Sequence, residues 1–291
     1  MKRAALLAIA MFFLANWCGA AQPHTVTGLV LKVDRSHKSL SVSCDSVPGY
    51  MDAMVMTFLV HDPKDLDDVK SGAMIEFTVH SDKKSSFAGN IHMVKFDSAE
   101  QEPQAAQRMK LLQNLVSPAA PGATLAAGDF VPDFAFIDQN QQKVTFSQFA
   151  GHVVVLTFFY TRCPNPDYCF RLNSNLGRLQ KRFSKRMGRD LVLLSVVIDP
   201  EHDQGNTLSN YANIWKANAQ GWHFLTGPLP DVEKLTHLFG MDFWSGEGTV
   251  THTFHTIIID QHRKLAANLE GNQFTAQQLG DLVETMLPQT N

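Results

Sequence analysis

The stretch VVVLTFFYTRCPNPDYCFRLNSNLGRLQKRF, residues 153–183, decides the fold of this chain. It opens with a continuous run of apolar, β-branched and aromatic residues from Val153 to Tyr160, which predicts a strand buried on both faces. The apolar positions that follow are spaced at i, i+4, i+7 and i+11, namely Leu172, Leu176, Leu179 and Phe183. This spacing predicts a helix with one apolar stripe.

Two cysteines, Cys163 and Cys169, lie at the joint between this strand and this helix. A thiol at such a joint faces the positive end of the helix dipole, which favours the thiolate. The thiolate is the form that binds metal or attacks a disulfide. The joint is therefore the predicted chemical centre, and we expect both thiols to be shifted toward ionisation.

The sequence on either side predicts two domains. Residues 129–291 alternate strand and helix patterns, which predicts an α/β domain of the thioredoxin type. Residues 24–97 hold five short strand patterns separated by turn residues, typical of a small all-β barrel of the OB type. Residues 98–128 change to a composition rich in Ala, Gln, Pro and Gly, which predicts a linker.

Composition excludes some classes of function. The 291 residues are 44% hydrophobic and 18% charged, which is ordinary for a folded protein, and they suffice for two cores. The net charge of −3 argues against a nucleic-acid partner, because phosphate binding needs a basic face.

The first 21 residues have the pattern of a secretory signal peptide. Lys2 and Arg3 precede a short apolar run, and small residues follow up to Ala21. We expect cleavage after Ala20 or Ala21, loss of Cys18, and a periplasmic protein that acts near the membrane without spanning it. An uncleaved anchor is the alternative.

The spacing of Cys163 and Cys169 leaves three interpretations open. The pair forms a structural disulfide, or it is the active site of a thiol–disulfide oxidoreductase, or it binds a soft metal. Five residues separate the cysteines, two of them prolines, whereas a dithiol oxidoreductase commonly has two. Two thiolates select Cu(I) or Zn(II) and need at least one further ligand.

His252 is the candidate third ligand, in the stretch TVTHTFHTIIID. We expect residues 252–260 to form a strand beside the central one. His252 and His255 are three residues apart, so on one strand their side chains point to opposite faces and only one can reach the cysteines.

Residues 129–287 resemble the Sco/SenC family of copper chaperones. The resemblance rests on FFYTRCPNPDYC, SVVIDPEHD, THTFHTIIID and LEGNQFTAQQL. It implies a thioredoxin-like domain that binds copper through two cysteines and a distal histidine and serves assembly of the copper centre of cytochrome c oxidase. By motif the ligands are Cys163, Cys169 and His252, and Asp199 is similar to a family residue near the site or is a strand-end capping carboxylate. The commonest family spacing is Cys-x-x-x-Cys followed by proline, whereas this chain has two more residues and Phe170.

The segment SCDSVPGYMDAMVMTFLVHDP, residues 43–63, predicts a second soft site. Met54 and Met56 are two apart on a predicted strand, so both thioethers lie on one face, and Cys44 and Met51 are close in sequence. Alternating methionines are also common as core filler. The segment resembles the small periplasmic copper-binding barrels of the CusF type. By that resemblance Met54 and Met56 match the methionine ligands, Cys44 replaces a histidine and Met51 replaces a capping tryptophan.

The sequence therefore predicts an exported copper-binding chaperone with two sites for Cu(I), the C-terminal one also suited to Cu(II). The expected partners are a copper donor protein and a copper-accepting apo-protein such as a copper subunit of an oxidase. Two enzyme classes remain as alternatives, a periplasmic thiol–disulfide reductase and, less well matched, a thiol peroxidase. A reductase does not need His252, and a copper site does.

Overall fold

The computed structural model describes residues 24–81, 85–94, 124–246 and 249–289. The predicted signal segment 1–21, Cys18 and most of the predicted linker 98–128 lie outside these ranges. Within them, no helix is both long enough and apolar enough to cross a bilayer.

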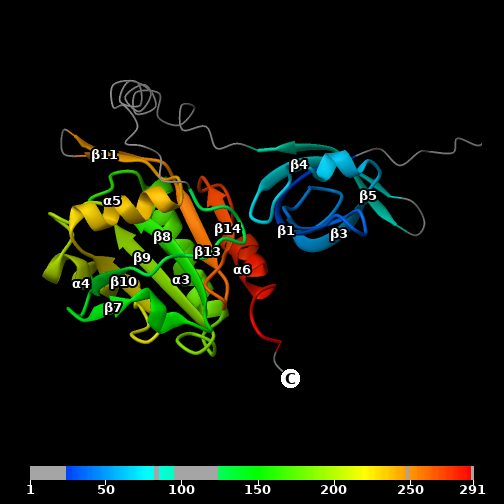
Figure 1. Ribbon diagram of the computed structural model, residues 1–291. Helices are drawn as coiled ribbons and strands as arrows, with labels where there is room; N and C mark the ends of the chain where they lie inside the picture. The colour runs from blue at the N-terminus through cyan, green and yellow to red at the C-terminus, as the bar shows by residue number, and fades with distance from the viewer. Residues whose placement is uncertain (1–23, 82–84, 95–123, 247–248, 290–291) are drawn as a thin grey trace, which may run out of the picture.

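The N-terminal part is the expected closed barrel of five strands (Figure 1). The strands follow the order β1-β2-β3-β5-β4, and β4 closes the barrel on β1. Alternation along the strands fills the interior with buried side chains that include Val26, Val30, Leu40 and Phe58. The elements are β1 (His24–Asp34), β2 (Ser39–Cys44), β3 (Met54–Val60), η1 (Pro63–Leu66), β4 (Met74–Ser81) and β5 (Ser86–Met93).

The C-terminal part is built on a seven-stranded sheet in the order β14-β13-β8-β9-β10-β6-β7. Strands β8, β9 and β10 run parallel, and β13 and β6 flank them antiparallel. The strands are β6 (Ala135–Asp138), β7 (Lys143–Thr145), β8 (Val153–Phe159), β9 (Leu191–Val197), β10 (Trp222–Thr226), β11 (Phe243–Gly246), β12 (Thr249–His252), β13 (His255–Ile259) and β14 (Leu265–Glu270). The helical elements are η2 (Phe146–Phe149), η3 (Pro166–Phe170), α3 (Arg171–Arg182), α4 (Gly205–Ile214), α5 (Leu229–Leu238) and α6 (Ala276–Glu284).

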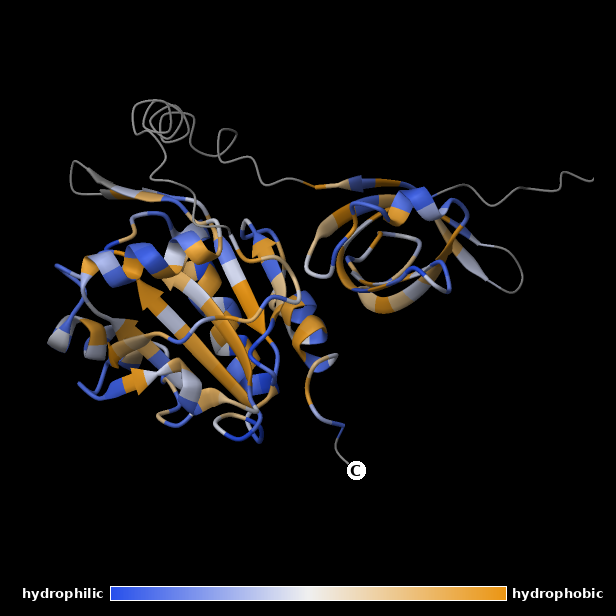
Figure 2. Ribbon diagram, in the orientation of Figure 1, coloured by the Kyte–Doolittle hydropathy of each residue, from blue (hydrophilic) through white to orange (hydrophobic). Residues whose placement is uncertain are grey.

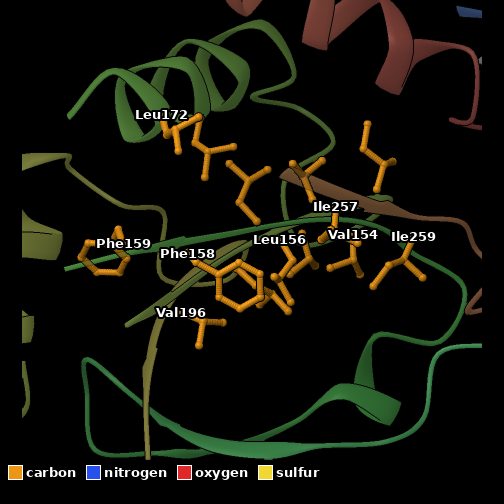
Figure 3. Packing of buried hydrophobic residues seen from close by; sticks show 14 of the residues in the cluster. Val154, Leu156, Phe158, Phe159, Leu172, Val196, Ile257 and Ile259 are labelled. Carbon is orange, nitrogen blue, oxygen red and sulfur yellow. The ribbon is translucent and has the colours of Figure 1, made fainter. Parts of the chain in front are cut away.

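The central strand β8 confirms the prediction made from its composition, since all seven of its residues are buried. Its apolar side chains meet those of β9 and β13 beneath α3, with Leu172 pointing from the helix toward the sheet (Figure 3). The central strands are the most hydrophobic part of this domain (Figure 2). Burying each Val, Leu, Ile or Phe side chain contributes about 1.5–3 kcal/mol, so this layer fixes the position of the joint that carries the cysteines.

The region around His252 differs from the single strand expected over 252–260. The strand β12 ends at His252 and pairs with β11, and β13 begins only at His255. The break occurs at Thr253, whose N–H donates to the carbonyl of Asp242 and whose Oγ1 accepts from the N–H of Asp242. These bonds turn the chain, so the two histidines belong to different strands.

Candidate functional site

The two cysteines lie on the segment between β8 and α3. Cys169 is buried in the short helical segment η3 directly before α3, and Cys163 is half-buried. The side chains of the two cysteines hydrogen-bond each other. Both are free thiols, which is the state required for metal binding or for disulfide reduction.

The two sulfurs have opposite acid–base properties. The hydrogen bond from Cys169, backbone N–H groups and the Tyr160 hydroxyl lower the pKa of Cys163 to about 6. The same hydrogen bond to Cys163, together with burial, raises the pKa of Cys169 well above its usual value. The expectation that both thiols favour ionisation is therefore wrong for Cys169, because the adjacent Cys163 thiolate and desolvation outweigh the helix dipole. At neutral pH the pair consists of one thiolate and one thiol.

His252 approaches this pair from the end of β12. Its Nε2 lies 3.9 Å from Sγ of Cys169, and its Nδ1 lies 2.8 Å from the carbonyl oxygen of Thr253. A carbonyl oxygen only accepts, so Nδ1 carries the proton and the lone pair of Nε2 faces the sulfur. Burial lowers the pKa of His252 to about 4, which keeps the imidazole neutral.

The separation of 3.9 Å suits a shared metal ion. With bonds of about 2.3 Å to sulfur and about 2.0 Å to imidazole nitrogen, a three-coordinate ion holds these ligands about 3.7 Å apart. In the described ranges, however, no group of three Cys, His, Asp or Glu side chains already stands at metal-binding spacing. Cys169 and His252 therefore form the preorganised part of the site.

His255 does not share this environment. Its Nδ1 lies 2.8 Å from Oδ1 of Asn268, whose amide in turn donates to the carbonyl of Phe239. His255 also lines a cavity of about 500 Å³ that is separate from the cysteine pair. The structure thus brings one of the two histidines to Cys169, namely His252.

A polar loop after β9 holds the residues that precede Cys163. The carboxylate of the fully buried Asp203 accepts from the N–H and the hydroxyl of Thr161, at 2.7 and 2.5 Å. Asp199 accepts from Arg162 at 2.6 Å and from His202 at 2.8 Å. Asp199, which the sequence left undecided, is thus connected to the cysteine segment through Arg162.

Sequence reasoning missed Asp203 and Tyr160. The Tyr160 hydroxyl hydrogen-bonds Cys163, and its ring packs edge-on against His252 with centroids 6.0 Å apart. Tyr160 is the last residue of the apolar run 153–160, for which the sequence predicts a strand and no role in the site. Asp203 is the last residue of the stretch DPEHD. The available signal for Asp203 was a third acidic residue, after Asp199 and Glu201, in a loop that follows a strand next to the central one.

Replacing Asp203 by Ala should lower the free energy of unfolding by about 2–3 kcal/mol, because two partly buried donors of Thr161 lose a charged acceptor. Urea unfolding followed by circular dichroism measures the change. Glu201→Ala, at an exposed position of the same loop, is the matched control and should stay within about 0.5 kcal/mol of the parent. Equal losses in the two variants would contradict the assigned role of Asp203.

The four predicted soft donors of the barrel lie on β2, on β3 and in the loop between these strands. Cys44 pairs directly with Met54 across β2 and β3, and Val42 pairs with Met56. Residues paired in this way point to the same face, so Cys44, Met54 and Met56 all lie on the interior face of the barrel wall. Met51 packs partly buried against the barrel core in the loop that joins these strands.

The donors of the barrel differ in exposure. Cys44 is buried, Met51 and Met56 are half-buried, and Met54 is 47% exposed. Burial raises the pKa of the Cys44 thiol to about 12, so this thiol holds its proton. Tyr50, next to Met51, stacks on His24 with ring centroids 3.8 Å apart, an aromatic contact that the sequence did not suggest. Of the two paired residues, Cys44 is therefore shielded from solvent and Met54 is accessible to it.

Comparisons with known proteins divide the chain at the same place. The family model SCO1/SenC matches residues 122–287, and the model for the copper binding periplasmic protein CusF matches residues 23–88. The SCO1 protein homolog of Bacillus subtilis is 29% identical over 97 residues, which are 33% of this chain and 49% of that protein. The mitochondrial SCO2 homolog of Danio rerio is 31% identical over 113 residues, which are 38% of this chain and 37% of that protein. The chain thus aligns with half or less of the length of these curated relatives.

A solved structure supports the fold of the C-terminal domain. A SCO1/SenC family lipoprotein from Bacillus anthracis superposes with a TM-score of 0.50 at 23% identity, over 56% of this chain and 99% of that one. The prediction of a thioredoxin-like α/β domain preceded by an all-β barrel is confirmed.

Proposed function

Because the chain belongs to the SCO1/SenC family, we propose that it is an exported copper chaperone that carries copper in both domains. The ligands of the C-terminal domain are Cys163, Cys169 and His252. Those of the barrel are Cys44, Met51, Met54 and Met56. The chemistry of the donors supports copper, since thiolates and thioethers select Cu(I) and an imidazole also suits Cu(II).

The observation that carries the proposal is the approach of His252 to Cys169. The unprotonated Nε2 faces a cysteine sulfur at 3.9 Å inside an apolar surrounding. A thiol–disulfide enzyme has no use for an imidazole at this place, whereas a copper site with two thiolates gains from it a third donor that suits both Cu(I) and Cu(II).

The acid–base state of the site suits stepwise copper binding. Cys163 is already a thiolate at neutral pH and is the half-exposed cysteine, so it is the first ligand that an incoming ion meets. The ion then replaces the proton of Cys169 and takes the lone pair of His252. In this order of binding, the ion bound to Cys163 brings that cysteine toward Cys169 and His252.

The barrel serves as a copper donor to, or acceptor from, the C-terminal domain. The match to the CusF model supports this role, as does the pairing of Cys44 with Met54 across β2 and β3, with Met56 on the same face of β3. That match and the predicted signal segment support export to the periplasm, with a copper donor protein and an apo-protein such as an oxidase copper subunit as partners. Delivery to the copper centre of cytochrome c oxidase is the function implied by the family resemblance.

One observation favours a second function, reduction of disulfides. A pKa of about 6 at the half-exposed Cys163 is what an attacking thiolate needs. Cys163 would attack a target disulfide, release one target thiolate and form a mixed disulfide. Cys169 would then give up its proton and attack Cys163, which leaves a Cys163–Cys169 disulfide and a fully reduced target.

Counting copper per chain tests the proposal. The reduced mature protein should retain two equivalents of Cu(I) against a competing chelator under anaerobic conditions. Cys163→Ser should retain one, and Met54→Leu combined with Met56→Leu should also retain one, because Leu keeps the volume of Met but offers no sulfur. Met93→Leu, at an exposed methionine of the same barrel, is the control and should retain two. A parent protein that holds a single equivalent, unaffected by the double methionine variant, would reduce the barrel to a structural module.

A further inference from the structure

The barrel does not stand apart from the thioredoxin-like domain, because strand β1 is buried on both of its faces. Val26 and Val30 point into the barrel core. Leu29 and Leu31, on the opposite face of the same strand, are 0% and 5% exposed and belong to the core of the C-terminal domain. Figure 1 shows β1 next to helix α6.

Polar contacts between β2 and α6 complete this interface. The hydroxyl of Ser43 donates to Oδ2 of Asp281 at 2.7 Å. The side-chain amide of Gln278 donates to the carbonyl of Ser43 at 3.3 Å and to Oδ1 of Asp45 at 3.0 Å. Ser43 and Gln278 are both buried, and Arg182 holds the carboxylate of Asp281 from the other side at 2.8 Å.

Cys44, the last residue of β2, lies between Ser43 and Asp45, the two residues that make these contacts. Because side chains alternate along a strand, Ser43 and Asp45 face α6 while Cys44 faces the barrel interior beside Met54. The same segment also approaches β1 closely at Gly28. A Cβ added to Gly28 would lie 2.5 Å from the Val42 side chain and 2.7 Å from the Ser43 carbonyl. The position of the Cys44 backbone is thus fixed by β1 and by α6 together.

We propose that docking of the barrel on α6 and binding of Cu(I) by the barrel are positively coupled through the segment Ser43–Asp45. Docking holds the backbone of Cys44 at its position opposite Met54, so this ligand is already ordered before the metal arrives. By linkage, Cu(I) in the barrel strengthens docking by the same factor. The coupling rests on the proposed function and adds that the C-terminal domain sets the copper affinity of the barrel.

The test uses the mature chain with Cys163→Ser and Cys169→Ser, so that the barrel alone reports. Adding Ser43→Ala and Gln278→Ala removes the three interdomain hydrogen bonds and leaves every barrel donor in place. We expect the Cu(I) affinity of the barrel, measured by competition with a chelator, to fall about tenfold, within the range typical of coupled sites. Gln278→Ala also removes half of the capping box of α6, so Thr275→Ala, which removes the other half of that box and no interdomain hydrogen bond, is the control and should leave the affinity unchanged.

Hydrogen exchange of α6 provides the reciprocal measurement. Cu(I) should slow exchange of the α6 amides in the parent background and should have little effect in the Ser43→Ala, Gln278→Ala variant, whose fold is checked by circular dichroism. Equal Cu(I) affinity in the parent and in the Ser43→Ala, Gln278→Ala variant would overturn the coupling, although the copper function would stand. The same holds if Cu(I) leaves hydrogen exchange of the α6 amides in the parent unchanged. A parent barrel that binds no Cu(I) would overturn both.

Discussion

His252→Ala should weaken Cu(I) binding at the C-terminal site by about 10- to 100-fold and weaken Cu(II) binding more strongly. The variant removes the nitrogen donor that lies 3.9 Å from Cys169 Sγ. Two thiolates can still hold Cu(I) in two-coordinate form, whereas Cu(II) loses the imidazole that suits it best. Competition with chelators for Cu(I), and titration followed by optical and electron paramagnetic resonance spectra for Cu(II), measure the two losses.

The matched control is His255→Ala, which should leave both affinities near those of the parent. His255 is also a buried histidine of the same region, but it hydrogen-bonds Asn268 instead of facing the cysteines. Reduction of a model disulfide should stay nearly intact in His252→Ala, because exchange depends on the thiolate fraction and access of Cys163. Parental copper binding by His252→Ala together with loss of reductase activity would establish the enzyme function in place of the chaperone.

The affinity of the C-terminal site for Cu(I) should rise about tenfold per pH unit between pH 7 and 9, or about 100-fold over this window. Each ligand must be free of its proton, so a ligand that is still protonated releases one proton on binding. Above pH 7, Cys163 with a pKa of about 6 and His252 with a pKa of about 4 have already lost theirs. Cys169, whose pKa is raised above its usual value, still holds its proton, and binding therefore releases one.

Measuring the Cu(I) dissociation constant at several pH values, under conditions where the barrel site is removed by Met54→Leu and Met56→Leu, gives this slope directly. Below pH 6 the slope should approach two, because Cys163 also becomes protonated. Tyr160→Phe provides a comparison, since it deletes a donor to the Cys163 thiolate and should extend the steeper region to higher pH. A slope of two throughout the window from pH 7 to 9 in the parent would show that Cys163 is an ordinary thiol.

The sequence by itself determined what depends on local pattern. A continuous apolar run predicted the buried strand β8, and the spacing of apolar residues predicted the buried face of α3. Turn residues marked the boundaries between the five strands of the barrel. The residue types and spacing of Thr275 and Gln278 are those of a capping box, and α6 begins there. These features require only neighbouring residues, because a strand or helix face is set by periods of 2 and 3.6 residues.

Only the tertiary structure decided which distant groups meet and how burial changes their chemistry. Cys163 and Cys169 are equivalent as a sequence pattern, yet one has a lowered and the other a raised pKa. The cause is the hydrogen bond between their side chains, which favours the thiolate of Cys163 and the thiol of Cys169. Likewise Asp203 reaches Thr161 across 42 residues, and Ser43 reaches Asp281 across 238. The spacing of apolar residues along the chain does not predict such contacts, because they arise from the way in which sheet, helices and barrel pack together.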